Sequence, residues 1–192
     1  AALRKLVDFA ASVGLGAVCL PAYGSEYYKL TDEERLQVVE EVVAHAAGRF
    51  SVVAQCNHGA ARVAAALARQ SVASGADVVS FALPRQMPLG EIDLLEYAAR
   101  ICDAVDTPVL IQDWNPAGPT VGASFCAELQ RRCPNFRYLK LEEPRMALKV
   151  RAIREATGDR VGVFEGWGGL YTLELLPAGI CGIMPGLAVS DF

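Results

Sequence analysis

Short apolar runs alternate with longer amphipathic stretches along the whole chain. Apolar residues recur at helical spacing up to Gly14, and a short apolar run at 16–20 follows. Thr31 and Glu34 have the spacing of a capping box, which predicts that the next helix begins there. A strand followed by a helix is therefore the predicted unit, and the same unit repeats through the rest of the sequence.

The repeated unit predicts seven short strands separated by helices. The strands are expected at 16–20, 51–55, 77–81, 107–112, 138–142, 160–164 and 182–184. The helices are expected to end near positions 14, 47, 74, 105, 132, 156 and 176. Strands that alternate with helices form parallel pairs, and strands covered on both faces are apolar throughout, as these are.

This order predicts an α/β protein of the (β/α)₈ TIM barrel type. A closed barrel needs eight strands and typically about 250 residues, whereas this chain has 192 residues and begins in a helix. Residues 1–192 are therefore predicted to form a single barrel domain that is incomplete at both ends, without the first strand and the C-terminal helices. Two strand edges would then lack a partner. A doubly wound open sheet is the alternative, although no GxGxxG follows the first strand.

Composition narrows the classes of partner. A hydrophobic fraction of 53% supports a sizeable core, and a formal charge of −4 without a basic block argues against nucleic acid. No apolar run approaches the length of a membrane span. The six cysteines are scattered and the two histidines are isolated, so reduced thiols, a cytoplasmic setting and no metal site are expected.

The predicted strand at 138–142 carries the most distinctive chemistry. Leu139 and Leu141 would face the helix layer, while Tyr138, Lys140 and Glu142 would face the barrel interior. A partly desolvated lysine favours the neutral amine, which can attack a ketone and form a Schiff base. The alternative is that Lys140 pairs with Glu142 and only anchors the end of the strand.

The carboxyl ends of the strands are where barrels of this type place their active sites. The segments that follow the predicted strands are rich in hydrogen-bonding groups, and they suit a small, polar, anionic substrate. They are 23–26, 57–59, 84–85, 112–115, Lys140 with Glu142, 165–168 and 184–186.

Several stretches in this order resemble the dihydrodipicolinate synthase / N-acetylneuraminate lyase family of Schiff-base barrel enzymes. They are Gly24 with 30–35, then 73–77, 108–112, 138–142, 166–169 and 182–186. The resemblance covers essentially the whole chain. It implies a longer parent protein, a homotetramer or dimer, and a 2-oxo acid as the small-molecule partner.

The resemblance also implies roles for individual residues. Lys140 lies at the position of the family's Schiff-base lysine, and the loop at 22–24 lies where the family binds the carboxylate of pyruvate or another 2-oxo acid. Gln112 stands where the family usually has a tyrosine that moves protons, although an amide cannot act as an acid or base. The predicted catalytic residues are Lys140, Glu142 and Gln112, and the predicted substrate-binding residues are Tyr23, Gly24, Ser25, Glu26, Gly166 and Met184.

The replaced tyrosine argues against a standard dihydrodipicolinate synthase or sialic acid lyase. The chain instead resembles the branch that includes 2-keto-3-deoxy sugar-acid dehydratases, at 25–26, 112–113, Lys140 with Glu142, and 166–169. A Schiff-base lyase, either dehydratase or aldolase, is therefore expected, without a metal or organic cofactor. The candidates for the acid and the base of the dehydration are Glu142, Glu26, Tyr23 and His58, and the sequence does not choose among them. Pyruvate condensation of the 4-hydroxy-tetrahydrodipicolinate synthase type, or binding of a 2-oxo acid without catalysis, are the alternatives.

Overall fold

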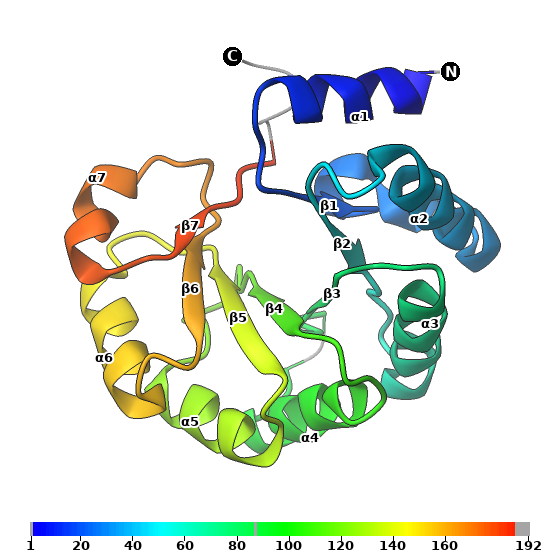
Figure 1. The fold of residues 1–192 in the computed structure, drawn as a ribbon. Coiled ribbons are helices and arrows are strands. Elements are labelled where there is room, and N and C mark those ends of the chain that lie inside the picture. Colours follow the sequence, from blue (N-terminus) through cyan, green and yellow to red (C-terminus); the bar gives the residue numbers. More distant parts are fainter. Residues whose placement is uncertain (1, 87, 187–192) are drawn as a thin grey trace.

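The computed structural model describes residues 2–86 and 88–186. Seven parallel strands form one curled sheet in the order β1-β2-β3-β4-β5-β6-β7, with helices around its outside (Figure 1). The strands are β1 (Ala17–Leu20), β2 (Ser51–Gln55), β3 (Val78–Ala82), β4 (Val109–Asp113), β5 (Phe136–Leu141), β6 (Gly162–Glu165) and β7 (Gly182–Ile183). The predicted strand–helix alternation and the parallel sheet are confirmed.

One helix precedes β1, and the others lie in the connections between consecutive strands. They are α1 (Ala2–Ser12), α2 (Asp32–Ala46), α3 (Ala61–Ala73), α4 (Glu91–Cys102), α5 (Ala123–Arg132), α6 (Ala147–Thr157) and α7 (Thr172–Leu175). Short 3₁₀ turns add η1 (Tyr23–Ser25), η2 (Tyr27–Lys29) and η3 (Leu176–Ala178). The turns η1 and η2 lie in a segment predicted to be a loop, and α7 is shorter than predicted because the three residues after it form η3.

Local sequence signals explain where the helices begin. The predicted capping box at α2 is present: Thr31 Oγ1 accepts a hydrogen bond from the Glu34 amide at 3.2 Å, and Glu34 Oε2 accepts one from the Thr31 amide at 2.8 Å. Three acidic residues occupy the first turn of α2, where they face the positive end of the helix dipole. None of the helices in the described part of the chain is long and apolar enough to cross a bilayer.

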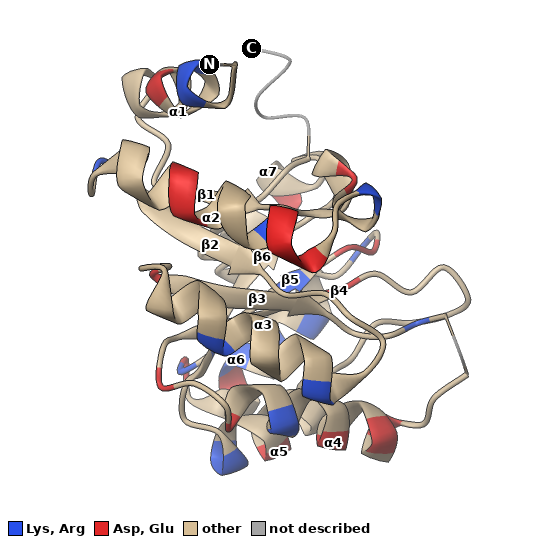
Figure 2. Ribbon diagram, turned by 90° about the vertical axis from the view of Figure 1, so that its right-hand side faces the viewer, with Lys and Arg blue, Asp and Glu red and all other residues tan. Residues whose placement is uncertain are grey.

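The core lies between the outer face of the sheet and the helices. Its larger cluster joins β3–β6 to α3–α6, and a smaller cluster joins β1 and β2 to α1 and α2. The side chains of Phe81, Ile111, Leu139 and Val163 are all 0% exposed and come from four neighbouring strands. Figure 2 shows charged residues on the surrounding helices and in the loops at both ends of the strands.

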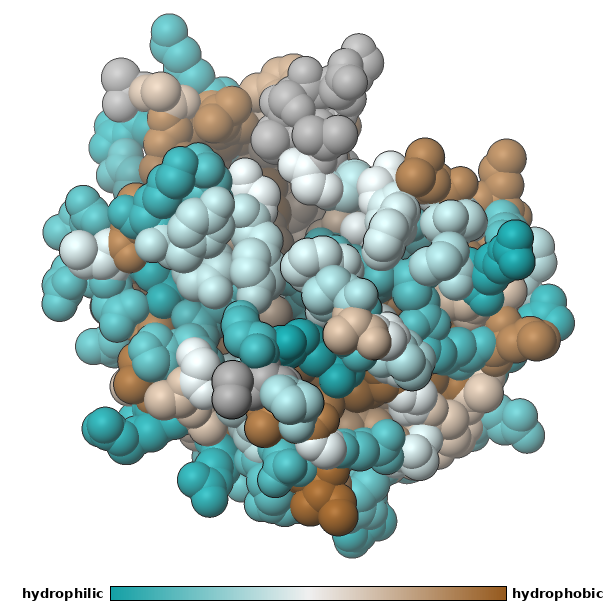
Figure 3. All heavy atoms as spheres, turned by 180° about the vertical axis from the view of Figure 1, so that it is seen from behind, coloured by the Kyte–Doolittle hydropathy of each residue, from teal (hydrophilic) through white to brown (hydrophobic). Residues whose placement is uncertain are grey.

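The two ends of the sheet remain open. Among the described residues, β1 pairs only with β2 and β7 pairs only with β6, as predicted for a barrel that lacks a strand. The segments after these two strands nevertheless approach each other, since a methyl group at Gly24 would lie 3.8 Å from the carbonyl oxygen of Gly186. Near this opening, Figure 3 shows hydrophobic side chains at the surface over α7, where Leu170 and Leu173 are 74% and 87% exposed.

Candidate active site

The alternation of β5 places one lysine inside the barrel. Leu139 and Leu141 are 0% exposed and pack into the helix layer, as predicted. Lys140 points to the opposite face, where its side chain is 13% exposed. A single strand therefore supplies core packing on one side and the amine of Lys140 on the other.

Lys140 forms an ion pair with the residue that follows the strand. Its Nζ lies 2.9 Å from Oε1 of Glu142, whose side chain is 18% exposed. The same carboxylate oxygen also accepts a hydrogen bond from Nε2 of Gln112. Gln112 lies directly opposite Lys140 in the register of β4 and β5, so the three predicted catalytic residues are in contact.

A second glutamine, which the sequence did not single out, extends this network. Nε2 of Gln55 donates to Oε1 of Gln112 at 2.5 Å, and the two side chains are 3% and 5% exposed. Gln55 comes from β2 and Gln112 from β4, so their contact spans β3, where Ser80 lies opposite Gln55 and Ala82 lies opposite Gln112. The only sequence signal that could have identified Gln55 is the alternation of side chains along β2, which places Gln55 on the inner face of the sheet.

Cys19 and Ser80 also face this part of the interior. Burial raises the pKa of the Cys19 thiol to about 11, while the nearby charge of Lys140 and the hydroxyl of Ser80 act in the opposite direction. Ser80 is 0% exposed, and its Oγ is among the buried atoms without a hydrogen-bond partner. The lysine is therefore surrounded by polar but uncharged groups, apart from Glu142.

The loop after β1 places the predicted substrate-binding residues at the barrel mouth. Gly24, Ser25 and Glu26 are exposed. Ser25 Oγ accepts a hydrogen bond from the amide of Ala22 at 2.7 Å and donates to its carbonyl at 3.2 Å, so this hydroxyl now stabilises its own turn. Glu26 forms an exposed ion pair with Lys29 at 2.6 Å and is not part of the Lys140 network.

Tyr23 is the member of this loop that approaches the network. Burial raises the pKa of its phenol well above the ordinary value, and the neighbouring Tyr27 and the negative charge of Glu142 act in the same direction. The rings of Tyr23 and Tyr27 meet edge to face at 5.2 Å. Tyr23 is thus a neutral phenol near the Glu142 carboxylate.

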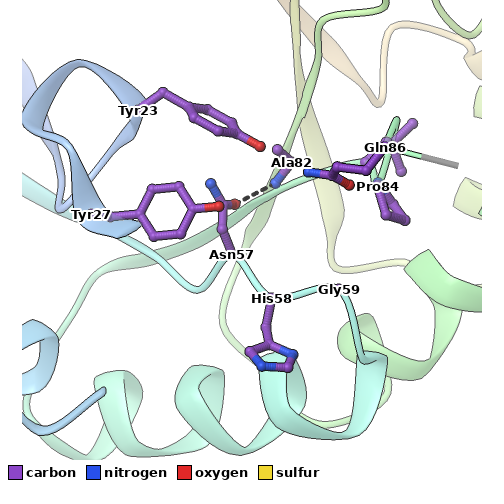
Figure 4. A pocket seen from close by; sticks show the side chains of 9 residues that line it. Tyr23, Tyr27, Asn57, His58, Gly59, Ala82, Pro84 and Gln86 are labelled. Atoms are coloured by element: carbon purple, nitrogen blue, oxygen red, sulfur yellow. Dashed lines mark hydrogen bonds between the residues drawn. The ribbon is translucent and has the colours of Figure 1, made fainter. Parts of the chain in front are cut away.

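Tyr23 and Tyr27 also line a polar pocket with Asn57 and Gln86 (Figure 4). Oδ1 of Asn57 accepts a hydrogen bond from the Ala82 amide at 2.6 Å, whereas its buried Nδ2 has no hydrogen-bond partner. His58 borders the pocket, but Figure 4 shows its ring turned toward the start of α3, and Nδ1 accepts from the Ala60 amide at 2.9 Å. His58 therefore caps that helix and does not face Lys140.

Gly166 lies against the lysine and leaves no room for a side chain. A methyl group at Gly166 would meet Cγ of Glu142 at 2.7 Å, Cε of Lys140 at 2.8 Å and the carbonyl oxygen of Leu141 at 2.9 Å. Its amide already donates to that carbonyl at 2.9 Å. Gly166 therefore lets the side chains of Lys140 and Glu142 pack against the backbone.

A buried carboxylate organises the glycine-rich loop that follows. Glu165 is 0% exposed, and its two oxygens accept hydrogen bonds from the amides of Trp167 at 3.0 Å and Gly169 at 2.7 Å. Met184, predicted to bind substrate, is half-buried just after β7, and its amide donates to the Glu165 carbonyl at 2.8 Å. These amides bond within the protein, which leaves the loop as a wall of the site.

The arginine of the predicted rim is neutralised within the protein. Arg85 forms two hydrogen bonds to Asp113, at 2.8 and 2.7 Å, and Asp113 also accepts from the Val121 amide at 2.6 Å. Asp113 is 0% exposed. This pair fixes the loop after β3 to the end of β4.

The fold and site together define an α/β-barrel protein with a partly buried lysine and carboxylate at the carboxyl ends of its parallel strands. The chain belongs to the Dihydrodipicolinate synthetase family, whose model matches residues 1–187. This finding confirms the resemblance seen in the sequence.

Two relatives of this chain carry the names of different enzymes. The chain is 30% identical over 195 residues to an L-2-keto-3-deoxyarabonate dehydratase of Azospirillum brasilense, covering 100% of this chain and 63% of that protein. It is 33% identical over 142 residues to a 4-hydroxy-tetrahydrodipicolinate synthase of Laribacter hongkongensis, covering 72% and 48%. The chain therefore spans less than two thirds of the length of these relatives.

Solved structures agree on the fold. Dihydrodipicolinate synthase from Aquifex aeolicus superposes with a TM-score of 0.89 at 25% identity, covering 95% of this chain and 62% of that one. A prophage protein of E. coli K12 from the same family, solved in complex with pyruvate, gives a TM-score of 0.86 at 20% identity and covers 95% and 62%. The prediction of a partial TIM barrel is confirmed.

Proposed function

We propose that this chain carries the catalytic core of a Schiff-base lyase that acts on a 2-oxo acid, with dehydration of a 2-keto-3-deoxy sugar acid as its reaction. The observation that supports this most directly is the partly buried ion pair at 2.9 Å between Lys140, on the inner face of β5, and Glu142, which follows the strand. A nucleophile beside a proton acceptor is the arrangement that imine formation requires.

The first half of the reaction activates the carbonyl carbon. Glu142 accepts a proton from the Lys140 ammonium, and the free amine attacks C2 of the 2-oxo acid. The carbonyl oxygen leaves as water, and a protonated imine joins Lys140 to the substrate. The positive imine then withdraws electrons from C3 and makes its proton removable.

The second half removes one molecule of water from the substrate. A base takes the C3 proton, the resulting enamine expels the hydroxyl at C4, and that hydroxyl leaves with a proton as water. Hydrolysis of the imine consumes the water released at its formation and frees Lys140. Glu142 is the proposed base because it contacts the lysine, and the neutral phenol of Tyr23 is the proposed donor to the leaving hydroxyl.

The proposed substrate class rests on two supports. The A. brasilense relative is named for a 2-keto-3-deoxy sugar acid, and the mouth of the barrel offers Tyr23, Tyr27, Asn57 and Gln86 as hydrogen-bonding groups for a hydroxylated chain. The backbone of the loop at 22–24, together with Ser25, is the proposed binding site for the substrate carboxylate. No cofactor is required for these steps.

Reductive trapping tests the proposal. The 192-residue chain is incubated with pyruvate or with a 2-keto-3-deoxy pentonate, treated with borohydride and digested for peptide mass analysis, after circular dichroism has confirmed folding. We expect an adduct on the peptide that contains Lys140 and its loss in Lys140→Ala. Lys149→Ala is the matched control, because Lys149 forms a similar pair with Glu143 at 2.6 Å.

Two alternatives make different predictions in the same assay. Condensation of pyruvate, which the name of the L. hongkongensis relative suggests, gives a pyruvate adduct but no loss of water from the sugar acid. A protein that binds 2-oxo acids without catalysis gives no adduct on Lys140. A folded chain that retains no label with either acid would overturn the lyase proposal.

A further inference from the structure

The buried contact between Gln55 and Gln112 has a defined direction. An ionised carboxylate accepts hydrogen bonds and donates none, so Gln112 must present its NH₂ group to Glu142. Its carbonyl oxygen then faces Gln55, which must in turn present its own NH₂ group at 2.5 Å. The carboxylate thus sets the orientation of both amides, and Gln55 holds Gln112 in that orientation.

This arrangement leaves a buried acceptor unsatisfied. Oε1 of Gln55 has no hydrogen-bond partner, although the side chain is only 3% exposed. Leaving such a group unpaired costs free energy that an apolar residue of similar volume would avoid. The contact with Gln112 therefore has to offset the free-energy cost of the unpaired acceptor. This cost indicates that Gln55 has a role in the site beyond filling space in the interior.

We propose that Gln55 is a positioning residue, which locks the amide of Gln112 as a donor so that Glu142 stays ionised and ready to take the C3 proton of the imine. This inference rests on the proposed function and adds to it. Gln55 contacts neither Lys140 nor Glu142 by any hydrogen bond found among the described residues, so it acts through Gln112.

Other charged and titratable groups around the carboxylate must be taken into account. Lys140 faces Glu142 from β5, and Tyr23 faces it from η1. Cys19 faces Lys140 from β1. Arg85 lies near the end of β4, but both of its hydrogen bonds go to Asp113. Replacing Gln55 changes none of these groups. A changed pH dependence of Glu142 in that variant would therefore result from the loss of the contact between Gln55 and Gln112.

The test compares Gln55→Leu with Ser71→Ala, since Ser71 is also a buried polar residue but lies on α3 in the helix layer, where its Oγ is 3.7 Å from Sγ of Cys56. Exchange of the pyruvate methyl protons in D₂O measures removal of the C3 proton as a function of pH. Borohydride trapping on Lys140 measures imine formation separately. In Gln55→Leu we expect unchanged trapping, exchange slowed at least about tenfold, and a pH midpoint of exchange raised by about one unit.

A second reporter needs no activity. With ¹³C-labelled glutamate and Glu142→Gln for assignment, the carboxyl signal of Glu142 should change from its ionised to its protonated position at higher pH in Gln55→Leu than in the unchanged protein and in Ser71→Ala. Equal midpoints in all three proteins would overturn the proposed role of Gln55. Absence of trapping in the unchanged protein would instead refute the lyase proposal, while the carboxyl signal would still decide the role of Gln55.

Discussion

Glu142 and Glu143 are neighbours in the chain, yet each pairs with a different lysine in a different environment. Glu142 faces the barrel interior and meets Lys140 at 2.9 Å, whereas Glu143 meets Lys149 of α6 at 2.6 Å in the helix layer. The four side chains have similar exposure, between 13% and 21%. Distance and burial alone therefore do not distinguish the two pairs.

The hydrogen bonds around each lysine do distinguish them. Nζ of Lys149 also bonds the carbonyl oxygen of Thr120 at 3.1 Å and its Oγ1 at 3.0 Å, so all three of its protons have acceptors. For Lys140, Glu142 is the one acceptor found in the described part of the chain. A saturated ammonium stabilises its surroundings, while an ammonium with one acceptor can lose a proton to that acceptor and react.

The largest expected effect concerns the inner pair and its glycine neighbour. Gly166→Ala should lower the rate of borohydride-dependent labelling of Lys140 by about 100-fold, because a methyl group would displace atoms of both Lys140 and Glu142 and misplacement by about 1 Å costs that much. Labelling kinetics followed by mass spectrometry measure this directly.

Gly122→Ala provides the control for that substitution. Gly122 has a φ of −120°, and a methyl group there would have no atom within 4 Å beyond its chain neighbours, so alanine fits without strain. If Gly166→Ala labelled as fast as Gly122→Ala, the close packing around Lys140 would be irrelevant to its reactivity.

The next prediction concerns the two faces of β5, of which one packs into the core and the other carries Lys140. Leu141→Ala should lower the free energy of unfolding by about 3 kcal/mol, because Leu141 is 0% exposed and its truncation leaves a cavity in the larger core cluster. Urea unfolding measures this loss. Labelling of Lys140 per folded molecule should persist, and a parallel loss of both properties would show that the two faces of the strand are not independent.

Periodicity and turn signals predicted most of the fold. The capping box at Thr31 and the apolar strand runs depend on local sequence, so helix and strand positions agree within a few residues. The 3₁₀ turns at 23–25 and 27–29 were missed because each is only three residues long, which is too short for a periodic pattern of apolar residues. The two unpaired strand edges could be predicted because a closed barrel needs eight strands and the sequence pattern shows seven, which can be counted without knowing how the side chains pack.

The site was predictable only in part, and for a physical reason. Alternation places Lys140 and Glu142 together because they lie on one strand end. Gln55 is far from them in sequence, and its contact with Gln112 depends on the register of β2, β3 and β4. The capping role of His58 likewise depends on a rotamer that spacing does not specify.

The smallest effect concerns the outer pair and its dependence on pH. Partial burial by itself raises the pKa of Glu143, but the bonds from Lys149 and Thr120 outweigh it and hold the pKa below its usual value of 4.5. A carboxyl group whose pKa is lower in the folded state stabilises the protein above the unfolded pKa, and this contribution is lost as the pH falls through the folded pKa.

Glu143→Gln should therefore cost about 1 kcal/mol or less at pH 7 and nothing well below about pH 4. Urea unfolding at both pH values measures the difference, and labelling of Lys140 at pH 7 should be unchanged. A variant that lost labelling while keeping its stability would show that the outer pair also controls the inner one.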